Sequence, residues 1–101
     1  MAEPPEMEGM TPSVSQEFTI TNKLGLHARP AAMFVKLTNR FNSEIWVERE
    51  DEQVNGKSIM GLMMLAAAHG SRIVVTAEGD DAEEALAAIG ELIGSGFQEE
   101  G

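Results

Sequence analysis

The sequence predicts one α+β domain in which an antiparallel sheet carries helices on one face only. Along the chain the expected elements follow the order strand, helix, strand, strand, helix, strand, helix, which favours an α+β fold over a doubly wound α/β sheet. The strands alternate apolar and polar residues, as strands with one buried face do. With 101 residues, 43% of them hydrophobic, the chain is large enough for one core.

The first strand and the first helix flank a loop that contains Gly25. Phe18 and Ile20 alternate with polar neighbours in a strand that starts near Gln16, and Pro30 suits the first turn of the helix that follows. The positions that recur at helical spacing, and that we expect to be buried, are Ala31, Phe34, Val35 and Thr38. The outward positions of this helix are Ala32, Met33, Lys36 and Leu37.

A hairpin and a short helix form the middle of the predicted domain. Residues 43–49 and 53–55 have strand character and are joined by an acidic turn at 50–52. Ser58 then stands as a natural N-cap for a short helix, which we expect to end near Gly70.

The last strand and the last helix complete the order. Residues 72–78 alternate in the strand pattern, and Asp80 with Glu83 resembles a capping box at the start of a helix. The apolar stripe of that helix consists of Ala85, Leu86, Ile89, Leu92 and Ile93.

Composition divides the chain into three segments. Residues 1–15 lack apolar periodicity, so we expect a disordered tail before a domain at 16–97, with a flexible acidic C-terminus at 98–101. No basic region leads into an apolar stretch, and no apolar run approaches the ~20 residues of a membrane-spanning helix. We therefore expect a cytoplasmic protein without membrane insertion.

Charge and residue counts exclude several function classes. The formal net charge of -10 argues against a nucleic-acid partner. The absence of cysteine and the wide spacing of the two histidines disfavour thiol chemistry and a metal site, and nothing in the sequence calls for a cofactor. Residues 18–43, however, contain no Asp or Glu. The cations in that stretch, which suggest an anionic ligand or an acidic partner, are Lys23, Arg29, Lys36 and Arg40.

The candidate site lies where the Gly25 loop meets the first helix. His27 precedes or caps that helix, where unpaired backbone N–H groups and the positive end of the helix dipole favour an anion. Arg29 adds a cation that can reach phosphate oxygens. The pattern predicts a site for reversible phosphoryl transfer at His27.

Two motifs resemble those of the histidine-containing phosphocarrier protein (HPr) family of the sugar phosphotransferase system. They are GLHARPA at residues 25–31 and NGKSIMGL at residues 55–62. The resemblance implies an HPr-like open-faced sandwich, with a four-stranded antiparallel sheet and three helices on one face. It also implies a carrier that is not itself an enzyme, and that is typically monomeric.

The resemblance also implies partners and site residues. The histidine that matches His27 accepts a phosphoryl group on Nδ1 from enzyme I and passes it to enzyme IIA, while the arginine that matches Arg29 steadies the phosphate. The family's partner surface is made by the first two helices. The positions carried over as partner-binding are Ala28, Ala32, Met33, Lys36, Ile59, Met60 and Met63.

Ser58 matches a serine that an HPr kinase phosphorylates in some bacterial branches of the family, in control of carbon catabolite repression. A phosphate there would add negative charge inside the partner surface and weaken enzyme I docking. A plain N-cap role needs no such modification. Both interpretations of Ser58 stay open on the sequence.

Other interpretations compete with the sugar-branch carrier. A nitrogen-branch or other regulatory HPr paralogue fits the same motifs, although the intact His27 and Arg29 argue against a form that has lost its carrier histidine. A protein-interaction module would use the methionine-rich helix as a docking patch. Of the remaining candidates, we expect His69 to complement the last carbonyls of a helix and Met64 to fill part of the core.

Overall fold

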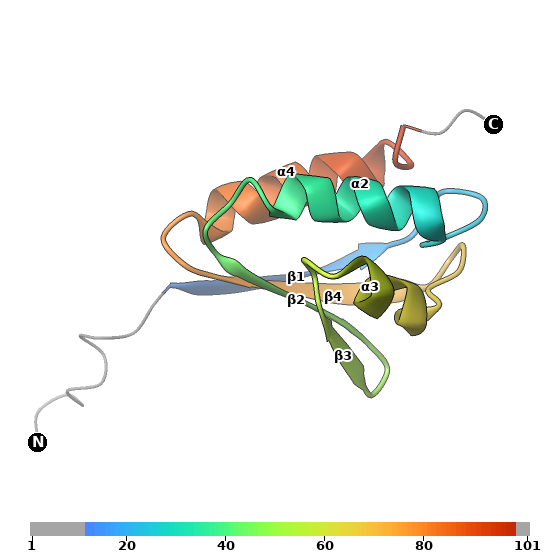
Figure 1. The fold of residues 1–101 in the computed structure, drawn as a ribbon, viewed down its shortest axis with the longest axis horizontal. Coiled ribbons are helices and arrows are strands. Elements are labelled where there is room, and N and C mark those ends of the chain that lie inside the picture. Colours follow the sequence, from blue (N-terminus) through green and yellow to red (C-terminus); the bar gives the residue numbers. More distant parts are fainter. Residues whose placement is uncertain (1–11, 99–101) are drawn as a thin grey trace, which may run out of the picture.

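The computed structural model describes residues 12–98, so residues 1–11 of the predicted tail (1–15) and residues 99–101 of the predicted flexible C-terminus (98–101) lie outside the described residues. The described part forms four strands and three helices (Figure 1). Their bounds are β1 Ser13–Thr19, α2 Ala28–Thr38, β2 Glu44–Arg49, β3 Glu52–Asn55, α3 Ile59–Leu65, β4 Arg72–Glu78 and α4 Ala82–Gly94.

The strands form a single antiparallel sheet in the order β1-β4-β2-β3. In the register of this sheet, Phe18 lies opposite Ile73 and Ile45 lies opposite Ala77. All three helices lie on one side of the sheet, with α2 and α4 side by side above it and α3 near the β3 edge (Figure 1). The predicted α+β open-faced sandwich of order βαββαβα is confirmed.

The core lies between the sheet and the helices. Ile73 and Val75 on β4 are fully buried and belong to one core cluster with Phe34 on α2 and Ile89 on α4, which are also fully buried. Leu62 anchors the inner side of α3 to the same core. Burial of each such side chain contributes about 1.5–3 kcal/mol to stability.

The first strand starts earlier than predicted. β1 begins at Ser13, and Ser13–Ser15, part of the predicted disordered tail, pair with Glu78, Ala77 and Thr76 of β4. The Ser15 and Thr76 hydroxyls are hydrogen-bonded at 2.7 Å. The pairing strand lies far away in the sequence, so local composition did not reveal this extension.

The predicted capping box at the start of α4 is wrong. Asp81 is the N-cap residue, and its side chain makes no capping hydrogen bond to α4. Its carboxylate instead accepts hydrogen bonds from the Asn42 backbone N–H (2.8 Å), the Ser43 backbone N–H (3.0 Å) and the Ser43 hydroxyl. The hydrogen bond from the Ser43 hydroxyl, followed by that from Asn42, lowers the pKa of Asp81. Asp81 thereby joins the turn before β2 to the start of α4.

The chain folds back after α4. Phe97 has a φ of 58°, donates its backbone N–H to Leu92 O at 2.9 Å and is 1% exposed, so it closes the end of the core. None of the helices in residues 12–98 is long and apolar enough to cross a lipid bilayer.

Candidate functional site

His27 lies where predicted, at the N-terminus of α2. It is the N-cap residue, with extended backbone angles (φ -84°, ψ -167°), and its carbonyl accepts the Ala31 N–H at 3.0 Å. Its side chain makes no capping hydrogen bond and is half-buried. The imidazole therefore sits at the helix end without serving as the helix cap.

The loop before His27 is held against the connection between α3 and β4. The Leu26 N–H donates to Ala67 O at 2.8 Å, and the Asn22 side-chain amide donates to Gly25 O at 2.8 Å. Gly25 has a φ of +73°, and a Cβ placed on it would lie 2.3 Å from Ala67 O. Only glycine fits this approach without displacing backbone, so the loop fixes the backbone position of His27.

The electrostatic surroundings of His27 favour an anion. The backbone N–H groups of Ala28 and Arg29 lie in the first turn of α2, where a helix offers no carbonyl partner, and that turn contains no acidic residue. Arg29 is exposed and forms no ion pair with another residue in the range 12–98. A phosphoryl group on His27 would meet both the helix terminus and an exposed guanidinium.

Ser58 caps α3, as predicted. It has an extended backbone, and its hydroxyl accepts the Gly61 N–H at 3.0 Å. The side chain is half-buried. The structure thus shows the structural role of this serine directly.

The outer side of α3 is an exposed apolar surface. Leu62 and Leu65 face the core, while Ile59 (41%), Met60 (71%) and Met63 (44%) are exposed. Met64 is 70% exposed, so the expectation that it fills part of the core is wrong. We call these four exposed residues the α3 patch. They are Ile59, Met60, Met63 and Met64.

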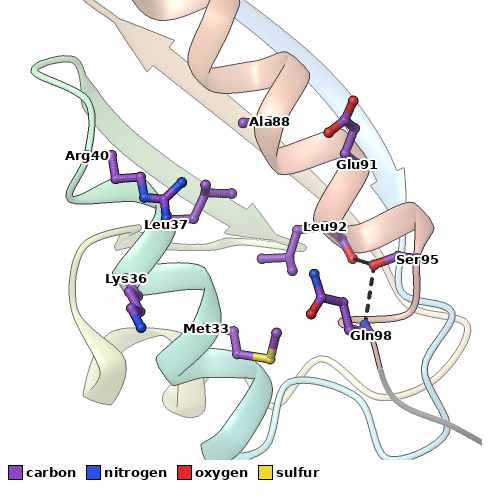
Figure 2. A pocket seen from close by; sticks show the side chains of 9 residues that line it. All are labelled: Met33, Lys36, Leu37, Arg40, Ala88, Glu91, Leu92, Ser95 and Gln98. Atoms are coloured by element: carbon purple, nitrogen blue, oxygen red, sulfur yellow. Dashed lines mark hydrogen bonds between the residues drawn. The ribbon is translucent and has the colours of Figure 1, made fainter.

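The predicted partner residues on α2 divide between two places. Ala28 and Ala32 are exposed near the His27 end of the helix. Met33 and Lys36 instead line an open groove of about 700 Å³ between α2 and α4. In Figure 2, Met33 points across this groove toward Leu92 of α4. The predicted surface is therefore not one uniform patch.

The structure corrects the expected role of His69 and adds two residues that the sequence analysis did not single out. The Nδ1 atom of His69 lies 3.3 Å from Asn22 O, so this imidazole contacts the His27 loop and not the carbonyls of a helix end as predicted. The carbonyl at the C-terminal end of α3 is bound by Arg49 instead, because its guanidinium donates a hydrogen bond to Leu65 O at 3.3 Å. Exposed Leu24 (69%) was also missed, because an apolar loop residue has no distinctive spacing.

The structure offers no metal centre within residues 12–98, because no group of three or more His, Asp or Glu side chains in that range is placed to hold an ion. The helix terminus, Arg29 and the imidazole are thus the chemical groups at the candidate site.

Comparison with known proteins identifies the family. The family model PTS-HPr, described as "PTS HPr component phosphorylation site", matches residues 14–95. The chain belongs to the HPr family. It is 50% identical to the phosphocarrier protein HPr of Neisseria meningitidis over 86 residues, which span 85% of this chain and 97% of that protein.

Other members of the HPr family are similar to this chain over most of its length. The HPr-like protein Crh of Halalkalibacterium halodurans is 50% identical over 76 residues, 75% of this chain and 90% of that one. A crystal structure of HPr from Thermoanaerobacter tengcongensis matches with a TM-score of 0.83 and 50% identity, covering 86% of this chain and 98% of that one. The HPr fold and the phosphocarrier family are thus shown for essentially the whole described domain.

Proposed function

We propose that this chain is a phosphoryl carrier of the phosphotransferase system, which accepts a phosphoryl group from phospho-enzyme I on His27 and passes it to enzyme IIA. The observation that carries the proposal is the placement of a half-buried imidazole at the N-terminus of α2, beside exposed Arg29. Membership of the HPr phosphocarrier family supports the class of reaction. The chain turns over only with its two partners, in the cytoplasm, and is not itself an enzyme.

Each transfer forms one bond to phosphorus and breaks another. The lone pair of His27 Nδ1 attacks the phosphorus atom, the bond to the donor atom of enzyme I breaks, and that donor keeps the electron pair. The reverse sequence delivers the group to enzyme IIA. Such a step needs positioning and electrostatic stabilisation more than covalent assistance, and the fixed loop and the helix terminus supply both.

Arg29 is the proposed phosphate-stabilising residue. Its guanidinium can donate two parallel hydrogen bonds to phosphate oxygens, which an ammonium group on lysine cannot do in the same geometry. Because the side chain is exposed and unpaired with other described residues, it is available when the phosphate arrives. Arg29→Lys should therefore retain part of the transfer rate, and Arg29→Ala should lose more.

Incubation with enzyme I and phosphoenolpyruvate, followed by intact mass measurement, tests the carrier role. The wild-type chain should gain one acid-labile phosphoryl group, and His27→Ala should gain none. His69→Ala is the matched control, since His69 is the other histidine and is exposed. A phosphate that survives in His27→Ala, or that disappears in His69→Ala, would refute the assignment.

Enzyme I and enzyme IIA are proposed to dock on the exposed parts of α2 and α3. The contacts would come from Ala28 and Ala32 beside His27, from Met33 and Lys36 at the groove, and from the α3 patch. Flexible thioether side chains suit a surface that must fit more than one partner. Nuclear magnetic resonance shifts on addition of enzyme I should concentrate there.

Ser58 is proposed as a second, regulatory phosphorylation site for an HPr kinase. The hydroxyl lies at the start of α3, so phosphorylation would place charge against the α3 patch and weaken enzyme I docking. HPr kinase and ATP should yield an acid-stable phosphate on the wild type and none on Ser58→Ala. An unmodified wild-type chain would reject this role and leave the capping role intact.

The similarity to Crh keeps a regulatory paralogue as the second candidate. Side-by-side phosphorylation by sugar-branch and nitrogen-branch enzyme I distinguishes the two, because the cognate enzyme should transfer faster. We also expect a monomer, although HPr from Thermoanaerobacter tengcongensis has been crystallised as a dimer. Light scattering of the purified chain tests this expectation.

A further inference from the structure

The α3 patch contains three exposed thioether groups on a helix of seven residues. Met60 and Met64 are 71% and 70% exposed, and Met63 is 44% exposed. The chain has no cysteine, so a thiol does not compete for oxidants that react with sulfur. Met33, in contrast, is half-buried in the groove beside α4.

These methionines are not needed to hold α3 in place. Leu62 and Leu65 bury the inner side of the helix, the Ser58 hydroxyl caps its start and the Arg49 guanidinium binds Leu65 O at its end. A chemical change on the outer side therefore has few contacts within the domain to disturb. Oxidation of the α3 patch should therefore affect the binding of a partner more than the fold of the domain.

We propose that Met60, Met63 and Met64 form a methionine-oxidation site through which peroxides weaken partner docking, an inference that rests on the proposed carrier function. In the reaction, a sulfur lone pair attacks one oxygen of hydrogen peroxide. An S–O bond forms and the O–O bond breaks, the proton of the transferred oxygen passes to the departing oxygen, and that oxygen leaves as water. The thioether is thereby oxidised by two electrons and the peroxide is reduced by two. The product is a polar sulfoxide, which methionine sulfoxide reductases return to the thioether.

The position of the patch determines the effect. α3 packs against α2, whose N-terminus carries His27. Under the proposed function, the partner that reaches His27 docks on the α3 patch as well. Burying a sulfoxide oxygen without a hydrogen-bond partner is unfavourable, and we expect the KM for enzyme I to rise roughly tenfold or more on full oxidation. Direct phosphorylation of His27 by phosphoramidate, a small donor that needs no docking surface, should not change.

The experiment oxidises the full chain with dilute hydrogen peroxide and locates each sulfoxide by peptide mass spectrometry. Of the four methionines in residues 12–98, Met60 and Met64 should oxidise first, Met63 next and Met33 last, in the order of their exposure. Phosphorylation is then measured at several concentrations of the chain, with enzyme I and with phosphoramidate. Far-ultraviolet circular dichroism checks that the fold is retained.

Two variants separate the patch from other effects of peroxide. The triple variant Met60→Leu, Met63→Leu, Met64→Leu keeps apolar side chains, and its own KM for enzyme I, measured before peroxide, should not rise after peroxide. Met33→Leu is the matched control and should lose docking on oxidation as the wild type does.

The outcomes distinguish this inference from the carrier function. A rise in KM that is confined to chains with the three methionines, at constant phosphoramidate rate, supports it. An unchanged KM after complete oxidation of the patch, or an equal rise in the triple leucine variant, overturns it and leaves the carrier function standing. Failure of enzyme I to phosphorylate even the reduced chain would instead overturn the proposed function itself, and the inference with it.

Discussion

Gly25→Ala should destabilise the domain far more than Gly70→Ala, although both glycines have a positive φ. Gly25 has a φ of +73° and Gly70 a φ of +89°. An added Cβ at Gly25 would lie 2.3 Å from Ala67 O and 2.8 Å from the Ala68 Cα, whereas at Gly70 it would meet nothing within 4 Å. The pair therefore separates backbone strain from steric contact.

The expected magnitudes follow from these contacts. An L-residue in the left-handed region costs roughly 1–2 kcal/mol, and Gly70→Ala should lose about that much stability. Gly25→Ala incurs the same strain and also forces backbone atoms apart, which breaks the hydrogen bond from Leu26 N to Ala67 O at a cost of about 1 kcal/mol or more. With the displaced packing, we expect a total loss of roughly 3–4 kcal/mol.

Urea unfolding followed by tryptophan fluorescence measures the difference, since Trp46 on β2 is the only tryptophan in the chain. The rate of phosphorylation by enzyme I should fall in Gly25→Ala even where the variant is fully folded, because the His27 loop is displaced. Equal losses of stability in the two variants, within about 0.5 kcal/mol, would show that the contact with Ala67 does not hold the loop.

Three further changes test other parts of the structure. Ala66→Gly should raise the free energy of unfolding by roughly 0.5–1 kcal/mol in a urea titration, because this C-cap has a left-handed φ of 54° that favours glycine. Asp81→Asn should destabilise the domain at neutral pH, because the Asp81 carboxylate accepts hydrogen bonds from Ser43 and Asn42. These bonds lower the pKa of Asp81 in the folded state below the ordinary 3.8. Their contribution to stability is therefore complete above pH 3.8 and is lost as the pH falls through the folded-state pKa, where the variant and the wild type should become equally stable. A Tm measured from pH 2 to pH 7 would contradict this if the gap between variant and wild type were constant. Phe97→Ala should cost about 3–5 kcal/mol, measured by thermal unfolding, because the ring is 1% exposed at the end of the core; a loss under about 1 kcal/mol would show that the turn after α4 is dispensable.

The features that could be predicted from the sequence are those that depend only on residues close together in the chain. The apolar stripe of α4, the alternation of β4 and the Ser58 cap are properties of short segments, and the structure places them as expected. In α2 the expected burial is confirmed for Ala31, Phe34 and Thr38. Val35, expected to be buried, is only half-buried, as are Met33 and Leu37, which were expected to face outward. The position of His27 at a helix start belongs to the same class, because a helix terminus is defined by a few consecutive residues.

Several features that were missed depend on how the chain folds back on itself. The Asp81 carboxylate turns away from its own helix because Asn42 and Ser43 present three donors to it, and the sequence near Asp81 contains no sign of them. Ser13–Ser15 become strand only because β4 offers an edge, and Phe97 becomes core only because the chain reverses after α4. The residues next to each of these positions in the sequence do not indicate which other segment of the chain each will contact.

The site combines a rigid part with an adaptable part, and each has a separate physical origin. The backbone of His27 is fixed by the approach of Gly25 to Ala67, which tolerates no side chain. The α3 patch is exposed, and three of its four side chains are flexible thioethers, so it can repack against different surfaces. Substitutions at the Gly25 contact should therefore change stability and the intrinsic rate of phosphorylation by any donor. Substitutions of Met60 or Met63 should change the KM for one partner more than for another, with the phosphoramidate rate unaffected.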